Sequence, residues 1–486
     1  MELKFGVNDS PPLKHTALYS FQHLVTMLGA TIVVPIILAT QLKLSASETG
    51  ILISNVLFCM GIATCLQSAL GTKLPIVQGS SFAFLPVMLL IIAQNEPLPD
   101  QAIDGANVAL RYISGTIILG AIFQFFLGYL GIAGKIQKLL TPVVVGPVII
   151  AIGLSLFKTG ANQAGTDWKL ALLTIVLVFV FTYFIRREDD SIHKFSFILS
   201  SIPVLSSVII VYSICLILSI SGIYTPIDKG FVSLEGINTG DWFRTELPVF
   251  TWGFPIFSLG YFLTILIAYA VITFESIGDY NAVAEISDID DNKGNTNPSD
   301  NQSSNHDRVS EYRVNKGIIV EGIGNIVTGI VGGVPTTSYA ENVGLVAITR
   351  VASRSVVFVT GIILIISGYV PNIGNLFNSI PQPVMGGLYC ILLGTITGIG
   401  VKITAKTDTK NMRNISIIGF TMFMSFCIPE YFSKFVIEGN NEVRNAIIAI
   451  GRSHMAVAAT VGLVLDIVIP DNIGGNLKKA ENGPSK

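Results

Sequence analysis

Apolar stretches long enough to cross a lipid bilayer recur along almost the whole chain, and this constrains its fold more than any other feature. A helix needs about 20 mostly apolar residues to span the hydrocarbon core. The composition agrees, because 51% of the 486 residues are hydrophobic and only 13% are charged, whereas about 25% are charged in soluble proteins. We therefore predict an all-α polytopic protein that is integral to the lipid bilayer. Fourteen windows approach or exceed the spanning length, at 17–40, 47–70, 74–93, 111–131, 140–157, 169–185, 197–222, 253–281, 314–333, 335–351, 354–372, 381–402, 411–428 and 444–469.

The rest of the composition argues against several classes of function. A formal net charge of −2 gives no indication of a nucleic-acid partner. The five cysteines lie in apolar stretches without the paired spacing of a zinc site or a disulfide framework. The five histidines are scattered, so no nucleophile with its base and no metal cluster is indicated. We expect a protein that is not an enzyme and has neither a cofactor nor a metal.

The positions of the basic residues predict the orientation in the membrane. With the amino terminus in the cytoplasm, most of the 30 lysines and arginines fall on the cytoplasmic side, as the positive-inside rule requires. Both termini are then cytoplasmic, and we expect the plasma membrane as the location. The polar segment at about 287–312 is poor in large apolar residues and should be a disordered cytoplasmic loop.

Two of the apolar windows, 74–93 and 335–351, are short and polar in the middle. Each begins at a proline after a glycine-rich turn, Pro75 in one and Pro335 in the other. Irregular backbone at membrane depth is tolerated only where protein or a cavity surrounds it. Seven spans separate the two windows, and an odd number reverses the orientation. Interrupted spans at matching places in two inverted repeats indicate a transporter's binding site near the middle of the membrane.

Polar and acidic residues inside the windows are the candidate functional groups. An ionised acid at the centre of a spanning helix costs roughly 2.5–3.5 kcal/mol on insertion scales, so it usually faces a cavity, pairs, or marks a transport path. Glu275 and Asp279 are four residues apart and share one helical face. The candidates are Gln22, His23, Gln78, Ser80, Ser81, Glu275, Asp279, Glu321, Glu341 and Asn342.

Structural interpretations compete with functional ones for some of these residues. Gln22 and His23 could simply hydrogen-bond between helices. Ser80 and Ser81 could cap a half-helix, and Glu321 could be hydrated near the cytoplasmic end of its span. Glu275 and Glu341 are the best candidates for a site, because apolar residues flank both of them.

Carboxylates in such a place would accept hydrogen bonds from N–H groups and take up a proton. The amino ends of half-helices near Ser80 and Ala340 would expose backbone N–H groups to a carbonyl of the ligand. A flat ring with alternating N–H and C=O groups fits this arrangement. An inorganic anion fits poorly, because Glu341 would repel it.

At these residues the chain resembles members of the nucleobase-ascorbate transporter family, also called nucleobase:cation symporter family 2. The family signature is an acid, amide or proline followed by Asn-x-Gly-x4-Thr and a basic residue. It is met here by Glu341-Asn342-Val-Gly344-Leu-Val-Ala-Ile-Thr349-Arg350. The run Glu275-Ser-Ile-Gly-Asp279-Tyr looks like the eighth span of the family, and the resemblance extends from Gln22-His23 to the last span.

The resemblance implies two inverted repeats of seven spans, with short strands and half-helices in spans three and ten. A core domain would comprise 17–131 (spans 1–4) and 253–372 (spans 8–11), and a gate domain 140–222 (spans 5–7) and 381–469 (spans 12–14). Homodimers are common in the family. The resemblance further implies roles for named residues, with substrate held by Glu275, Glu341, Phe82, Ala340, Ser81, Tyr339 and Asn342, and coupling by Asp279, Glu321 and His23.

The expected function is inward symport of a nucleobase with a proton by alternating access. The acid at position 341 resembles the residue that uracil carriers of the family have there. Asp279 resembles the residue found in the branch that carries purines such as xanthine or uric acid. The interpretation favours uracil and leaves the purine open. Na+ coupling stays an alternative, and an anion exchanger of the same architecture is disfavoured by the acid at 341.

Overall fold

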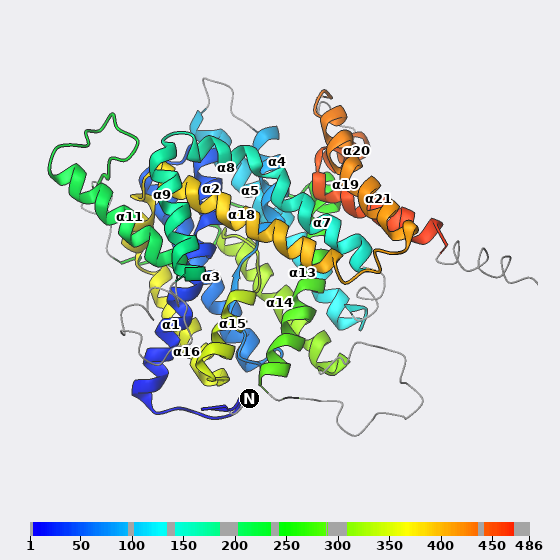
Figure 1. The fold of residues 1–486 in the computed structure, drawn as a ribbon, viewed down its shortest axis with the longest axis horizontal. Helices are drawn as coiled ribbons and strands as arrows, with labels where there is room; N and C mark the ends of the chain where they lie inside the picture. Colours follow the sequence, from blue (N-terminus) through cyan, green and yellow to red (C-terminus); the bar gives the residue numbers. More distant parts are fainter. Residues whose placement is uncertain are drawn as a thin grey trace, which may run out of the picture.

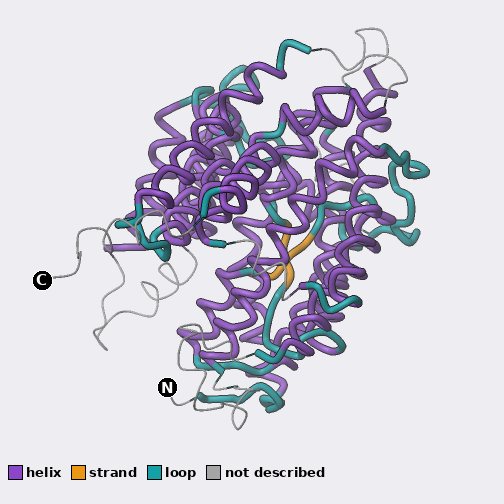
Figure 2. The backbone as a smooth tube through the Cα atoms, turned by 90° about the vertical axis from the view of Figure 1, so that its right-hand side faces the viewer, coloured by secondary structure: helices purple, strands orange, loops and turns teal. Residues whose placement is uncertain are grey.

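The computed structural model describes residues 3–95, 102–133, 141–184, 203–234, 243–287, 289, 309–435 and 442–470. Most of the described chain is helical (Figure 1), and two three-residue strands lie near the middle of the molecule (Figure 2). Most of the expected loop at 287–312 lies outside the described residues. The first half contains α1 (Leu13–Thr31), α2 (Val33–Gln41), α3 (Ala46–Ala69), β1 (Gln78–Ser80), η1 (Phe82–Phe84), α4 (Leu85–Gln94), α5 (Ala102–Tyr129), α7 (Pro142–Ser155), α8 (Phe157–Ala164), α9 (Trp168–Phe179), the π-helical turn η2 (Val180–Phe184) and α11 (Pro203–Ile220). The second half contains α13 (Leu259–Ile286), α14 (Glu311–Val331), β2 (Thr336–Ser338), α15 (Ala340–Thr349), α16 (Arg354–Gly368), α17 (Pro371–Asn378), α18 (Gln382–Thr404), α19 (Met412–Phe432), α20 (Glu442–Arg452) and α21 (His454–Val468).

The described helices confirm a membrane-spanning architecture. Nine of them are long and apolar enough to cross a bilayer, and three shorter apolar helices accompany them, at Phe82–Gln94, Trp168–Phe184 and His454–Val468. The windows at 74–93 and 335–351 are interrupted as predicted, since each contains a strand followed by a short helix. An arrangement of fourteen spans in two inverted repeats is consistent with this order of elements.

Three windows contain a break. The window at 17–40 is still one candidate span, Leu13–Gln41, but it divides into α1 and α2 around Ile32, because Pro35 has no N–H to donate to the carbonyl of Thr31. The window at 444–469 divides at Ser453, whose hydroxyl accepts the N–H of Ala456 and caps α21. The pair α16 and α17 bends by 83°, where Pro371 begins the second helix.

The helices pack in pairs that relate the two halves of the chain. Helix α3 packs on α16 and α5 packs on α14, so spans two and eleven, and four and nine, are neighbours. An inverted repeat of seven spans relates span two to span nine and span four to span eleven. It therefore converts the α3–α16 pair into the α14–α5 pair. The same operation relates the pair α9–α11 to the pair α19–α21, and α7 packs on α18. A division of these helices into a core and a gate domain stays a prediction.

The two strands cross between the helices near the centre of the molecule (Figure 2). They are antiparallel, with Gln78 opposite Ser338, Gly79 opposite Thr337 and Ser80 opposite Thr336. Because the strands run in opposite directions, the helices that follow them, α4 and α15, leave the crossing in opposite directions. An inverted repeat requires this geometry.

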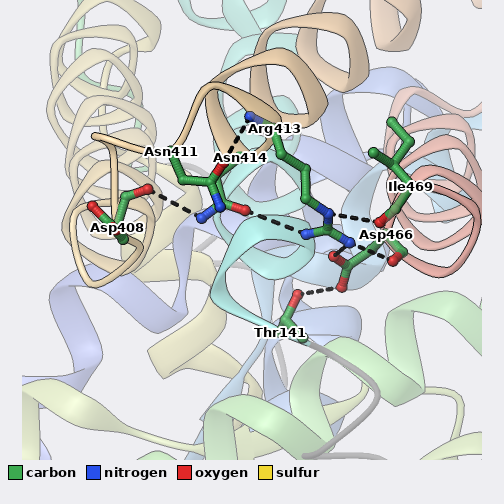
Figure 3. A network of polar contacts seen from close by, with 7 residues as sticks. All are labelled: Thr141, Asp408, Asn411, Arg413, Asn414, Asp466 and Ile469. Atoms are coloured by element: carbon green, nitrogen blue, oxygen red, sulfur yellow. Dashed lines mark hydrogen bonds and ion pairs between the residues drawn. The ribbon is translucent and has the colours of Figure 1, made fainter. Parts of the chain in front are cut away.

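A cluster of polar residues joins α7, α19 and α21 (Figure 3). Arg413 at the start of α19 forms an ion pair with Asp466, 3.0 Å apart, and both side chains are largely buried. The guanidinium also donates to the carbonyls of Asp466, at 2.6 Å, and Ile469, at 2.7 Å. The hydroxyl of Thr141 donates to Asp466 Oδ2 at 2.8 Å. This cluster, the Arg413 network, ties three helix ends together.

Candidate substrate site

A cavity of about 90 Å³ lies where the crossing strands meet the short helices. One wall is formed by the strands, η1, the start of α15 and α13. The opposite wall is formed by side chains of α7 and α18, all of them apolar except Thr395. Among the described side chains of the lining, Glu275 on α13 is the one acidic group. The lining residues are Ser80, Ser81, Phe82, Ala83, Ile149, Ile152, Val271, Glu275, Thr337, Ser338, Tyr339, Ala340, Leu392, Thr395, Ile396 and Ile399.

Five of the predicted substrate residues therefore lie together, namely Glu275, Phe82, Ala340, Ser81 and Tyr339. Glu341 is the second residue of α15, immediately after Ala340, but its side chain lies outside the described part of the structure. Asn342 is buried and does not line the cavity. The sequence did not single out the apolar wall of α7 and α18, because Ile and Leu there look like any other membrane residues.

The two short helices present their amino ends to the cavity in different ways. Ser81 caps η1, since its hydroxyl accepts the N–H of Ala83 at 3.3 Å, and it also lines the cavity. Ser81 can thus both cap a short helix and take part in the site. Tyr339, the residue before α15, provides no side-chain cap, and the N–H of Asn342 bonds back to the Tyr339 carbonyl at 3.1 Å. The first N–H groups of α15 therefore begin at the cavity wall without a capping side chain.

The strand crossing depends on a close approach at Gly79. A Cβ atom at this position would lie 2.5 Å from Cδ2 of Tyr339, so the ring of Tyr339 packs on the bare backbone of Gly79. Thr64 on α3 holds the first strand, since its hydroxyl accepts the N–H of Gln78 at 3.0 Å. Ser80 donates to the Thr31 carbonyl at 2.6 Å, which is the carbonyl that Pro35 leaves without a helical donor. The break between α1 and α2 thus anchors β1.

The side chain of Asn325 on α14 forms hydrogen bonds to the backbone of the second strand, as a neighbouring strand would. Its Oδ1 accepts the N–H of Thr336 at 2.7 Å, and its Nδ2 donates to the Thr336 carbonyl at 3.0 Å. The same Nδ2 donates to Oε1 of Gln124 on α5 at 3.1 Å. Neither Gln124 nor Asn325 is among the candidates predicted from the sequence, although a polar amide within an apolar window is the signal that could have identified them.

Glu321 lies one helical turn before Asn325 and is only 2% exposed. Its Oε2 accepts from Gln124 Nε2 at 3.0 Å. Its Oε1 accepts from the hydroxyl of Ser276 at 2.8 Å and from the N–H of Ser338 at 3.1 Å. The alternative of a hydrated residue near a span end is therefore wrong, because Glu321 is buried and holds β2, α5 and α13 together.

Asp279 is linked to the same cluster and is less buried than Glu321. Its Oδ2 accepts from the hydroxyl of Ser338 at 2.7 Å. That hydroxyl also lies 3.2 Å from Ser276 Oγ, and Thr337 Oγ1 lies 3.0 Å from Ser276 Oγ. The two acids predicted to couple transport thus share one network behind the cavity wall.

His23, the third predicted coupling residue, lies apart from that network. Nδ2 of Asn342 donates to the His23 carbonyl and contacts His23 Nδ1, both at 3.0 Å. Both side chains are buried, with His23 2% and Asn342 1% exposed. The pair therefore attaches α15 to α1, as the structural interpretation of a hydrogen bond between helices proposed.

The fold and this buried site define an integral membrane transporter of small molecules. Residues 14–434 match the model Xan_ur_permease, described as a permease family. Because this match covers most of the chain, the protein belongs to that family of transporters, which are not enzymes. The resemblance inferred from the sequence is confirmed.

Curated relatives agree with this assignment. The chain is 28% identical to solute carrier family 23 member 2 of Homo sapiens, with 96% of this chain and 75% of that protein covered. It is also 28% identical to nucleobase-ascorbate transporter 12 of Arabidopsis thaliana, with 91% of this chain and 63% of that protein covered. The chain is therefore similar to transporters from both animals and plants, while its assignment to the family rests on the match over residues 14–434.

Solved structures support the fold. The murine anion transporter Slc26a9 in its inward-facing state aligns with a TM-score of 0.61 at 13% identity, covering 95% of this chain and 69% of that one. The transmembrane domain of a cyanobacterial bicarbonate transporter, BicA, aligns with a TM-score of 0.50 at 14% identity, covering 96% of this chain and all of that domain. At such identities the likeness concerns the fold alone.

Proposed function

We propose that this transporter is a symporter that carries a nucleobase, namely uracil, into the cytoplasm together with a proton. The observation that supports it best is the cavity, in which the Glu275 carboxylate and the start of α15 face an apolar wall. A carboxylate accepts ring N–H groups, backbone N–H groups donate to ring carbonyls, and apolar side chains contact the faces of the ring.

Glu341 is proposed as the second carboxylate of the site. It is the second residue of α15, so it belongs to the first helical turn beside the cavity. An ionised carboxylate there accepts hydrogen bonds but cannot donate one. The N–H edge of uracil matches two acceptors, whereas a phosphate or bicarbonate ion would be repelled.

Alternating exposure would come from movement between two groups of helices. The strands, α13 and α15 form one side of the cavity, and α7 and α18 form the other. We propose that the first group belongs to a core domain and the second to a gate domain, and that the gate moves against the core. Moving one charge inward through 100 mV releases about 2.3 kcal/mol, enough for roughly 50-fold accumulation of a neutral base.

A purine is the second candidate substrate, and Asp279 favours it. This acid stands where the purine carriers of the family have one, and it is hydrogen-bonded to Ser338 on the cavity wall. Xanthine and uric acid also carry alternating N–H and C=O groups. Na+ is the corresponding alternative for the coupling ion, since carboxylate and hydroxyl oxygens bind hard cations.

Uptake of radiolabelled uracil into proteoliposomes tests the proposal. Proton and Na+ gradients are imposed separately, and unlabelled xanthine, uric acid and ascorbate are added as competitors. Saturable uptake of uracil that follows the proton gradient and resists xanthine supports the proposal. Uptake of labelled xanthine without uracil would assign the substrate to the purine class, and dependence on Na+ would replace the proton.

The variant Glu341→Gln sharpens the choice of substrate. An amide both donates and accepts, so uracil binding should weaken at least tenfold and xanthine binding should improve. Glu430→Gln, an exposed position on α19, is the matched control. Unchanged uracil affinity in Glu341→Gln would remove this residue from the site.

A further inference from the structure

Two hydroxyl groups bridge the two acids behind the cavity wall. From Asp279 the contacts run to Ser338 Oγ at 2.7 Å, then to Ser276 Oγ at 3.2 Å, then to Glu321 Oε1 at 2.8 Å. Ser276 and Glu321 are buried, whereas Asp279 is partly exposed and Ser338 lines the cavity. The chain of contacts therefore leads from the site into the interior.

The number of hydrogen atoms in this chain depends on the charge of the acids. Each serine hydroxyl has one hydrogen to donate. When both acids are ionised, Ser338 donates to Asp279 and Ser276 donates to Glu321. No hydrogen is then left for the contact between the two hydroxyl oxygens, which is also the longest of the three at 3.2 Å. One added proton supplies the missing hydrogen and makes the chain continuous.

The orientation of Gln124 decides which oxygen of Glu321 can take part. Asn325 bonds both polar groups of the Thr336 backbone, so its amide has one orientation, and its Nδ2 donates to Gln124 Oε1. Gln124 must then present its NH2 group to Glu321 Oε2. A proton on the side of Oε2 that faces Gln124 would meet another donor, whereas Oε1 is the oxygen that faces the Ser276 hydroxyl.

We propose that Ser276 and Ser338 form a two-hydroxyl path through which one proton is shared between Asp279 and Glu321. The inference rests on the proposed coupling of transport to protons. In the transfer, the proton of Asp279 passes to Ser338, the hydrogen of Ser338 passes to Ser276, and the hydrogen of Ser276 passes to Glu321. Each hydroxyl loses and gains one hydrogen, so one proton moves from Asp279 to Glu321 and the three hydrogen bonds reverse direction.

Other titratable groups near this path come mainly from α13. Glu275 is four residues before Asp279 on α13 and lines the cavity. Tyr269 and Tyr280 lie close enough to interact with the charge of Glu321. Tyr269 donates to the Ile117 carbonyl at 3.1 Å. Tyr280 accepts from Gln67 at 2.7 Å and keeps its own O–H to donate, with Ser276 and Glu321 among its hydrogen-bonding neighbours. Helices α5 and α14 contribute the neutral amides of Gln124 and Asn325.

The path gives the substrate a means of influencing the proton. Ser338 supplies a hydroxyl to Asp279, a backbone N–H to Glu321 and part of the cavity wall. A base bound against β2 would therefore be in contact with the residue that connects both acids. The buried acid would hold the proton out of contact with water while the gate moves.

The test separates binding, exchange and proton-driven accumulation in proteoliposomes that contain a trapped pH dye. Ser276→Ala removes the hydroxyl next to Glu321, and Ser276 is not itself a lining residue, although its hydroxyl contacts Ser338 and Thr337 behind the wall. Uracil binding and the exchange of labelled for unlabelled uracil at equal pH should stay within about 2-fold of wild type. Uptake driven by a pH gradient and the accompanying dye signal should fall at least 10-fold.

Two further variants identify the cause of the loss. Ser276→Thr retains a hydroxyl and should restore most of the dye signal. Thr273→Val is the matched control, because Thr273 is buried on the same helix and its hydroxyl bonds only to the Tyr269 carbonyl at 2.7 Å among the contacts of the described chain. This variant should behave as wild type, which would exclude a general effect of removing a hydroxyl from α13.

The alternative outcomes are distinct. If the wild type moves protons with uracil and Ser276→Ala does so equally well, the path is wrong and proton coupling stands. If Ser276→Ala loses binding and exchange in parallel with accumulation, or Ser276→Thr fails to restore coupling in a folded protein, the hydroxyl has a structural role and the path is again wrong. The wild type is also tested with xanthine in place of uracil. If it transports either substrate without any signal from the pH dye, the proton coupling itself is overturned.

Discussion

The cluster around Glu321 and the Arg413 network both place charge among helices, yet they neutralise it in different ways. The hydrogen-bond partners of Glu321 are neutral dipoles, among them the amide of Gln124, the hydroxyl of Ser276 and the N–H of Ser338. Arg413 instead meets an opposite charge on Asp466 and two carbonyls at the end of α21 (Figure 3). A cation at the carboxyl end of a helix is favourable in its own right.

The two clusters are therefore suited to different roles. A carboxylate surrounded by dipoles stays sensitive to the arrival of a proton, because no cation fixes its charge. An ion pair that also caps a helix has its charges fixed by one another, so it serves as a tie between elements. We therefore expect changes at Glu321 to affect transport first and changes in the Arg413 network to affect stability first.

The largest effect is expected from Glu321→Gln. Its new NH2 group would face a donor whichever way the amide turns, so at least one of Gln124, Ser276 and Ser338 loses its acceptor. Net uptake should fall at least 100-fold, while Glu430→Gln, exposed on α19, keeps normal uptake. Radiolabelled uptake with both variants at equal expression measures this, and near-normal accumulation in Glu321→Gln would contradict a coupling role for the residue.

Gly79→Ala should rank second. The added Cβ would lie 2.5 Å from the ring of Tyr339, so the strand crossing must open or the ring must leave the cavity wall. We expect substrate binding to weaken 10-fold or more. Gly419→Ala on α19, where a Cβ meets nothing within 4 Å, is the matched control. Equal affinity for the two variants would show that the close approach at Gly79 does not position the site.

Asp466→Asn should affect stability more than transport. Removing one partner of a buried ion pair typically costs about 3–5 kcal/mol, and the partial exposure of Asp466 reduces this. The melting temperature in detergent should drop by several degrees while the substrate Kd stays unchanged. Asp408→Asn, an exposed site nearby, should leave both quantities unchanged. A change in Kd without a change in melting temperature would reverse the distinction between the two clusters.

The smallest effect is expected from Thr141→Val. This change removes one neutral donor from Asp466 Oδ2 and keeps the ion pair, a loss of about 1 kcal/mol. The drop in melting temperature should be a fraction of that for Asp466→Asn. Combining the two substitutions should add little, because the second acts on the same carboxyl group, and full additivity would mean that Thr141 acts elsewhere.

The class of fold and the position of the site along the chain could be predicted from the amino-acid sequence alone. Hydrophobic length is a local property, so the membrane windows and the interruptions at 74–93 and 335–351 could be predicted without tertiary information. The acids in those surroundings were conspicuous for the same reason, and Glu275 does line the cavity beside β1 and β2. The match to the permease family confirms the class that these motifs indicated.

Which polar groups meet depends on how the helices pack. Gln124 and Glu321 are 197 residues apart, and Asn342 and His23 are 319 apart, so no local pattern could pair them. Pro35 breaks a helix and frees the Thr31 carbonyl that Ser80 then occupies. The direction of each hydrogen bond around Glu321 follows from the packing of α5, α13 and α14 on one strand, because an amide or hydroxyl takes its orientation from its neighbours and not from its place in the sequence.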